Sequence, residues 1–256
     1  MCKQSFGGIT KKEVIVFQTQ IMMGSQFGRV KKAKNIEDII IACLRIGWND
    51  AFRHTSENVK KEGHSILEEE EKKWRKKKNG KVKVHEEEHD DFICGNIINE
   101  IVDVFICYAC ATSTDGKIEV AGKEFERLKG IFCNYKETEG KYQLCFGHFQ
   151  KMFNIALKLY ACLYLCRDDL EISENLFEEQ IINNIQNADC PIDSIILDKL
   201  SEETKNKEYI LDHKWSKYGT KSYPVEKYNK VQKTISELES VQGKSNLYYD
   251  FIAWRQ

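Results

Sequence analysis

The most informative stretch of the chain runs from residue 146 to residue 160 and reads FGHFQKMFNIALKLY. The glycine near its start predicts a turn, and the apolar run that follows predicts a helix buried on most sides. Lys151, Asn154 and Lys158 are three and four residues apart, so they share one face of that helix. We therefore expect a core helix that exposes a narrow polar stripe and is entered through a turn.

The rest of the chain favours an all-α (mainly α) fold. It has 256 residues, 41 % of them hydrophobic, and only 2 prolines, which is enough for a sizeable core. Apolar residues recur at helical spacing after Asn35, which we expect to be an N-cap with Asp38 three residues on. The STDGK stretch at 113–117 predicts a break between helices. Further helices are expected within 92–112, 123–135, 175–188, 194–200 and 225–242.

Charge and cysteine usage limit the class of protein. The net charge is -1, but lysines gather in 3–34 and again in 214–233. Such patches suit a phosphate backbone, and ordinary solvated lysines explain them equally well. Most of the 10 cysteines stand in apolar runs, which is typical of reduced thiols in a core. No secretory signal or membrane span is visible, so we expect a cytoplasmic protein and no membrane partner.

Two motifs that suggest metal binding have simpler explanations. HEEEH at 85–89 fits the H-E-x-x-H pattern of zinc metalloproteases, which remains a remote alternative. It lies in 57–91, a charge-dense stretch that we interpret as an exposed insertion. Cys107 and Cys110 form a C-x-x-C motif inside an apolar run, where core packing is the simpler reading. We therefore expect no metal and no cofactor.

Lys151 and Asp193 are the candidates for chemistry. A lysine amine acts as a nucleophile once it has lost its proton, and apolar surroundings such as those of Lys151 favour that loss. The alternative is a structural lysine at the edge of an amphipathic helix. Asp193 follows Pro191 and is well placed to cap a helix that begins at Ser194. A carboxylate held rigidly there could also stabilise a developing positive charge.

These segments resemble the helix-hairpin-helix DNA glycosylase superfamily. There a hairpin of the form L-P-G-V-G-x-K-T-A-N leads into a helix whose lysine attacks the sugar, and an aspartate follows in a segment like V-D-T-H-V. GHFQKMFN matches at Gly147, Lys151 and Asn154, and PIDSII matches at Asp193, with serine where the family has threonine. NLYYDFIAW is similar to an L-x-x-D-x-x-x-W stretch of the archaeal 8-oxoguanine glycosylase branch.

The resemblance covers about residues 140–256 and departs from the family pattern at two positions. The second hairpin glycine is replaced by Phe149 and the hairpin proline by Phe146. Because hairpin glycines let backbone amides approach a DNA phosphate, the phosphate anchor is altered here. The resemblance implies one bilobal helical domain over 1–256, with a hairpin and catalytic region at 140–256 and a cleft between two lobes.

The resemblance also implies a function and a set of site residues. The function is excision of a modified base from DNA, followed by abasic-site (AP) lyase cleavage, carried out by a monomer with Lys151 as nucleophile and Asp193 as the catalytic carboxylate. The DNA-binding residues would be Gly147, His148, Gln150 and Lys158, and the base pocket would hold Phe149, Asn154, Tyr248, Asp250 and Trp254. The alternative from another class is a non-catalytic helical interaction or regulatory protein, of a host-defence or phage-related kind, that uses 57–91 as its contact surface.

Overall fold

The computed structural model describes residues 5–6, 9–10, 24, 26–52, 101–132, 146–211, 214–219 and 221–253. The predicted all-α fold is confirmed, since helices make up nearly all the regular structure in these ranges. Two strands of two residues each, β1 (Ser5–Phe6) and β2 (Ile9–Thr10), pair antiparallel. The helices are α2 (Phe27–Val30), α3 (Ile36–Phe52), α6 (Val102–Cys110), α7 (Thr114–Phe132), α8 (Phe146–Leu165), η1 (Glu174–Leu176), α9 (Glu179–Asn184), η2 (Ile185–Asn187), α10 (Ser194–Thr204), α11 (Glu208–Leu211), η3 (Trp215–Lys217), α12 (Val225–Glu237) and α13 (Leu247–Ala253).

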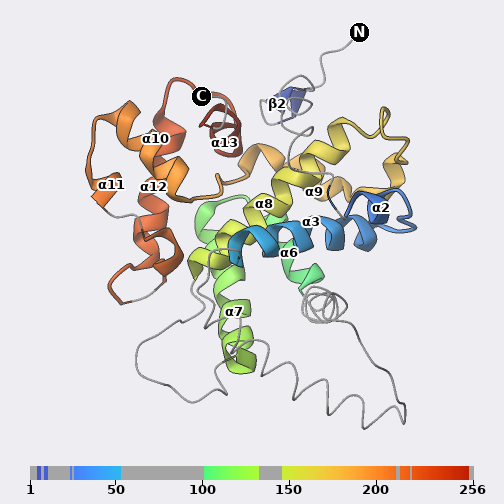
Figure 1. Ribbon diagram of the computed structural model, residues 1–256, viewed down its shortest axis with the longest axis horizontal. Helices are drawn as coiled ribbons and strands as arrows, with labels where there is room; N and C mark the ends of the chain where they lie inside the picture. The colour runs from blue at the N-terminus through green and yellow to red at the C-terminus, as the bar shows by residue number, and fades with distance from the viewer. Residues whose placement is uncertain are drawn as a thin grey trace.

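Helix α8 forms the centre of the molecule (Figure 1). Every residue of this helix except Tyr164 is buried, including the polar stripe that was expected to be exposed. Helix α3 packs along it, and the other contacts of α8 come from α6, α7 and η3. Gly47 of α3 permits the close approach, because a Cβ at that position would lie 2.3 Å from the backbone oxygen of Met152.

Two of the predicted helix caps are confirmed. The Asp38 backbone N–H donates to Asn35 Oδ1 over 2.9 Å, and the Asn35 N–H donates to Asp38 Oδ2 over 3.3 Å. This reciprocal pair fixes the start of α3. Asp193 is the N-cap of α10, and its Oδ1 accepts from the Ile196 N–H at 3.1 Å. The cap therefore holds the Asp193 side chain in one orientation.

Two local predictions are wrong, those for Gly147 and Cys107. Gly147 lies in no turn, because α8 already begins at Phe146. The absence of a side chain at Gly147 instead allows close packing, since a Cβ there would lie 1.9 Å from the Trp215 backbone oxygen. The break predicted at STDGK is confirmed, since α6 ends at Cys110 and α7 begins at Thr114, where the Gly116 N–H donates to Ser113 Oγ. Cys107 is exposed rather than packed in the core. Residues 57–91, with the HEEEH stretch, and the hairpin segment before α8 lie outside the described residues.

Candidate functional site

The Lys151 amine lies between two carboxylates. Lys151 Nζ is 3.5 Å from Asp193 Oδ2 and 2.9 Å from Asp50 Oδ2. Lys151 and Asp193 are therefore neighbours, although 42 positions separate them in the chain. The lysine side chain is 6 % exposed, the Asp193 side chain 13 % and the Asp50 side chain 39 %. The amine is thus nearly buried, and Asp50 is the more exposed of its two carboxylate partners.

Gln150 fixes the position of Asp193 relative to Lys151. Its Nε2 donates to the Ile192 carbonyl at 2.9 Å, and its Oε1 accepts from the Ile192 N–H at 3.1 Å. This paired amide contact joins the backbone just before Asp193 to the residue just before Lys151. Gln150 was predicted to contact DNA, but it is fully buried. Its described role is to hold the two site residues together.

The two oxygens of the Asp193 carboxylate have separate partners. Oδ1 accepts from the first turn of α10, and Oδ2 faces the Lys151 amine. A helix N-terminus carries partial positive charge, which stabilises an ionised carboxylate. The structure therefore presents to the amine a fixed anion whose orientation does not depend on that amine.

Asp50 and Trp215 were missed by the sequence analysis. Asp50 lies near the end of α3, about 100 positions before Lys151, and belongs to no recognisable motif. Trp215 begins η3, and its ring centroid lies 4.8 Å from Lys151 Nζ, within the range of a cation–π contact. The partly exposed indole also packs edge-on against the His148 ring at 5.9 Å. Only the tertiary fold brings these groups to the amine.

Asn154 takes part in a buried network of polar groups. Tyr108 Oη donates to Asn154 Oδ1 at 2.8 Å, Asn154 Nδ2 donates to Tyr228 Oη at 3.0 Å, and Tyr228 Oη donates to Asp189 Oδ2 at 3.0 Å. The Asp189 carboxylate also lies 3.3 Å from the ammonium of Lys117. Burial raises the pKa of both tyrosines well above its usual value, so they remain neutral hydroxyl donors.

This network changes the interpretation of Asn154. Its amide was predicted to line a base pocket, but here it is fully buried and joins α6, α8 and α12 through hydrogen bonds. The three hydrogen bonds that link Tyr108, Asn154, Tyr228 and Asp189 are 2.8–3.0 Å long. A buried polar group stabilises a fold when its hydrogen bonds are made in this way. The described role of Asn154 is therefore structural.

Lys158 forms the second buried ion pair on α8. Its Nζ lies 2.6 Å from Asp250 Oδ2, and both side chains are less than 7 % exposed. The ammonium also lies 5.9 Å from the Phe251 ring centroid. A contact between Lys158 and a DNA phosphate, as predicted, would require this pair to open. The structure does bring together two of the predicted site residues, Lys158 of α8 and Asp250 of α13.

The remaining predicted site residues are spread over the core and the surface. Gly147 and His148 lie buried in the first turn of α8, where the Gly147 N–H donates to the Tyr218 carbonyl at 3.0 Å, so neither is presented to a phosphate. Phe149 is fully buried, with its ring 6.1 Å from that of Phe153, and forms part of the core. Tyr248 is half-buried under the Lys244 ammonium, 3.7 Å from its ring centroid. Trp254 lies outside the described residues.

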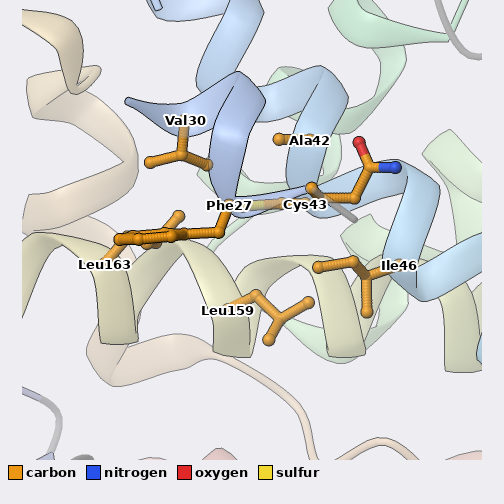
Figure 2. A pocket seen from close by; sticks show the side chains of 8 residues that line it. Phe27, Val30, Ala42, Cys43, Ile46, Leu159 and Leu163 are labelled. Atoms are coloured by element: carbon orange, nitrogen blue, oxygen red, sulfur yellow. The ribbon is translucent and has the colours of Figure 1, made fainter. Parts of the chain in front are cut away.

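A small apolar pocket lies between α2, α3 and α8 (Figure 2). Its volume of about 10 Å³ has room for one water molecule, far less than a nucleobase needs. It reaches α8 at Leu159 and Leu163, two or more helical turns beyond Lys151, so it is separate from the amine. In the described part of the chain, no group of three or more His, Cys, Asp or Glu side chains is arranged to hold a metal ion.

Comparison of the chain with protein-family models, curated proteins and solved structures gives no match. None of the helices in the described ranges is both long and apolar enough to cross a membrane. Function is therefore inferred from the geometry around Lys151: a shielded amine, a rigid carboxylate, and a second carboxylate open to solvent.

Proposed function

We propose that the protein is a DNA glycosylase with AP lyase activity, which uses Lys151 as its nucleophile. The observation that carries this proposal is the distance of 3.5 Å between Lys151 Nζ and Asp193 Oδ2. Lys151 resembles the nucleophilic lysine of the glycosylase superfamily, and Asp193, in a separate segment of the sequence, resembles its catalytic aspartate. A substrate of this kind is double-stranded DNA, with the modified nucleotide turned out of the stack.

The site supplies the groups that the reaction needs. The ammonium of Lys151 gives a proton to Asp193, and the free amine then attacks the anomeric carbon as the bond to the base breaks. Asp193 passes that proton to the departing base and is again an anion. Asp193 stabilises the positive charge that develops on the sugar, and its cap contact keeps it in place while it does so. The nitrogen gives a second proton to the ring oxygen as the sugar ring opens to a lysine–sugar Schiff base. Loss of a proton from the neighbouring carbon to water then expels the 3′ phosphate.

Borohydride trapping tests the proposal, because it reduces the Schiff base to a stable covalent adduct. The intact protein is incubated with duplexes that carry abasic sites or a panel of modified bases. We expect an adduct with the parent protein and none with Lys151→Gln. Lys123→Gln is the matched control, since Lys123 is an exposed lysine of α7 whose Nζ pairs with Glu119 at 2.7 Å. An adduct that persists in Lys151→Gln would contradict the assignment of the nucleophile.

A non-catalytic interaction protein is the second candidate, and one observation favours it. The Lys151 amine has two carboxylates and an indole ring as neighbours, and most of the other predicted site residues are buried among protein partners. Such burial is typical of structural polar groups. This candidate predicts no adduct with any DNA, and a Lys151→Gln change that alters only stability.

A further inference from the structure

The segment from Lys214 to Lys227, which we call the 214–227 segment, is strongly basic. It holds Lys214, Lys217, Lys221 and Lys227 against one acid, Glu226. The first three lysines are exposed, and in the described part of the chain no carboxylate pairs with them. Lysines farther along α12 differ, because Lys230 pairs with Glu208 at 3.0 Å and Lys233 lies 4.0 Å from Glu237.

This segment packs directly against the candidate site. Its Trp215 ring lies 4.8 Å from the Lys151 amine. Its Tyr218 carbonyl accepts the Gly147 N–H at 3.0 Å, and the missing side chain of Gly147 leaves space for the Trp215 backbone. The exposed lysines on either side of Trp215 are therefore attached to the first turn of α8, next to the amine that would meet a sugar.

Local contacts order the described residues of the segment, 214–219 and 221–227. The Gly219 N–H donates to the Tyr223 carbonyl at 2.8 Å, and Gly219 takes a φ of 92°, which favours glycine. Two lysines contact the Tyr223 ring, with Lys214 Nζ 5.4 Å and Lys227 Nζ 4.7 Å from its centroid. Several exposed ammonium groups close together in one segment suit the negative charges of a nucleic-acid backbone.

We propose that the 214–227 segment is the surface on which the DNA phosphate backbone lies when the sugar reaches Lys151. This inference rests on the proposed glycosylase function for its choice of partner. It also supplies what the altered hairpin lacks, because Gly147 and Lys158 are buried and Phe149 replaces a hairpin glycine. The contacts would be to phosphates, so they would position the DNA without reading its sequence.

A salt-dependence experiment tests this surface. The triple variant Lys214→Gln, Lys217→Gln, Lys221→Gln removes three charges from exposed side chains, and its thermal unfolding is measured to establish that it is folded. The control triple variant changes Lys31, Lys32 and Lys34, also exposed lysines, to glutamine. These follow α2, at the opposite end of α3 from Asp50 and about 20 Å away along the helix. Figure 1 shows α2 on the other side of the molecule from α11 and α12.

Binding to a fluorescent duplex that carries a tetrahydrofuran abasic analogue is followed by anisotropy over a series of salt concentrations. Each phosphate contact adds about 0.9 to the slope of log affinity against log salt, and hence about eightfold in affinity between 1 M and 0.1 M salt. We expect the triple variant to lose about 2.7 from the slope and up to about 500-fold in affinity at 0.1 M salt. The control variant should keep the parent slope within about one contact.

The outcomes separate this inference from the proposed function. A triple variant that is folded and retains the parent slope would overturn the inference, as would an equal loss of slope in the control variant. A selective loss of slope, with no borohydride adduct from the parent protein, would support the DNA surface and remove the lysine chemistry. A parent that binds no duplex even at low salt would overturn both. Weaker binding to anionic lipid vesicles with duplex binding unchanged would assign the surface to membranes and overturn the inference.

Discussion

Replacing Asp193 by asparagine separates its capping role from its proposed chemical role. Asparagine caps a helix about as well as aspartate, so its amide oxygen can take over the bond from the Ile196 N–H. The other end of the side chain changes from an anion at 3.5 Å from Lys151 Nζ to a neutral NH₂ donor. The substitution therefore removes one charge and keeps the volume and the cap.

The cost in stability should be small because Lys151 retains a second partner. Asp50 Oδ2 remains 2.9 Å from the amine, so the substitution does not leave a buried ammonium without a carboxylate. We expect a loss of about 1.5–3 kcal/mol, the scale of one hydrogen bond to a charged group. For a chain of this size that lowers the melting temperature by roughly 3–12 °C. Removal of the only partner of a buried charge would cost about 3–5 kcal/mol.

The cost in activity should be large if Asp193 faces the developing charge. Loss of one fixed electrostatic stabiliser typically slows a reaction by about 10²–10³-fold, so single-turnover base excision should fall by at least about a hundredfold. Asp50→Asn is the matched comparison, since it removes the other carboxylate from the same amine. Its side chain is 39 % exposed, and water screens its charge, so we expect excision within about tenfold of the parent.

The assay is single-turnover excision at saturating protein, run beside thermal unfolding of both variants. Near-parent excision by Asp193→Asn would leave Asp193 as a cap alone and refute the paired-residue reasoning. A hundredfold loss in Asp50→Asn with little loss in Asp193→Asn would show that Asp50, and not Asp193, has the chemical role. A melting temperature that falls by much more than about 12 °C in Asp193→Asn would refute the structural reasoning, because Asp50 would then fail to hold the amine.

Three further predictions concern the fold. Gly147→Ala should lower the free energy of unfolding by about 1–3 kcal/mol, because the added Cβ would lie 1.9 Å from a backbone oxygen. Gly122→Ala in α7 should raise it by about 0.5–1 kcal/mol, because a Cβ there has nothing within 4 Å. Urea unfolding of both variants checks this. Asp189→Asn should lower the melting temperature by roughly 6–20 °C, because it leaves the buried Lys117 ammonium without its carboxylate, and calorimetry that finds a smaller change would contradict this pairing. Iodoacetamide should label Cys107 in the folded protein and reach the buried thiols only after unfolding, as peptide mass mapping would reveal. Those protected thiols are Cys43, Cys162, Cys166 and Cys190.

The sequence predicted the helical fold because its signals are local. Helical spacing of apolar residues, the Asn35–Asp38 box and the Asp193 cap each depend on residues within one or two turns of one another. The errors occurred where tertiary packing overrides local preference. Glycine normally favours a turn, but at Gly147 the neighbouring η3 segment comes too close for any larger side chain. The sequence carries no sign of that approach.

The candidate site could be predicted only in part for the same reason. Lys151 and Asp193 were found because each has a local context, a polar face on an apolar helix and a cap after a proline. Asp50 and Trp215 have no such context, since they reach the amine from α3 and η3, distant parts of the chain. The polar face itself was interpreted as a surface stripe, whereas it is buried and each of its groups has its own partners.

That burial explains why a core helix carries lysines at all. Along one face of α8, Lys151 meets α3 and the α10 cap, Asn154 meets α6 and α12, and Lys158 meets α13. Each polar group thus fixes α8 to different neighbours, and each would be costly to leave without a partner. Only the Lys151 group includes a carboxylate as exposed as Asp50. Chemistry with an outside substrate is therefore expected at the N-terminal end of α8, where the helix also meets the basic 214–227 segment.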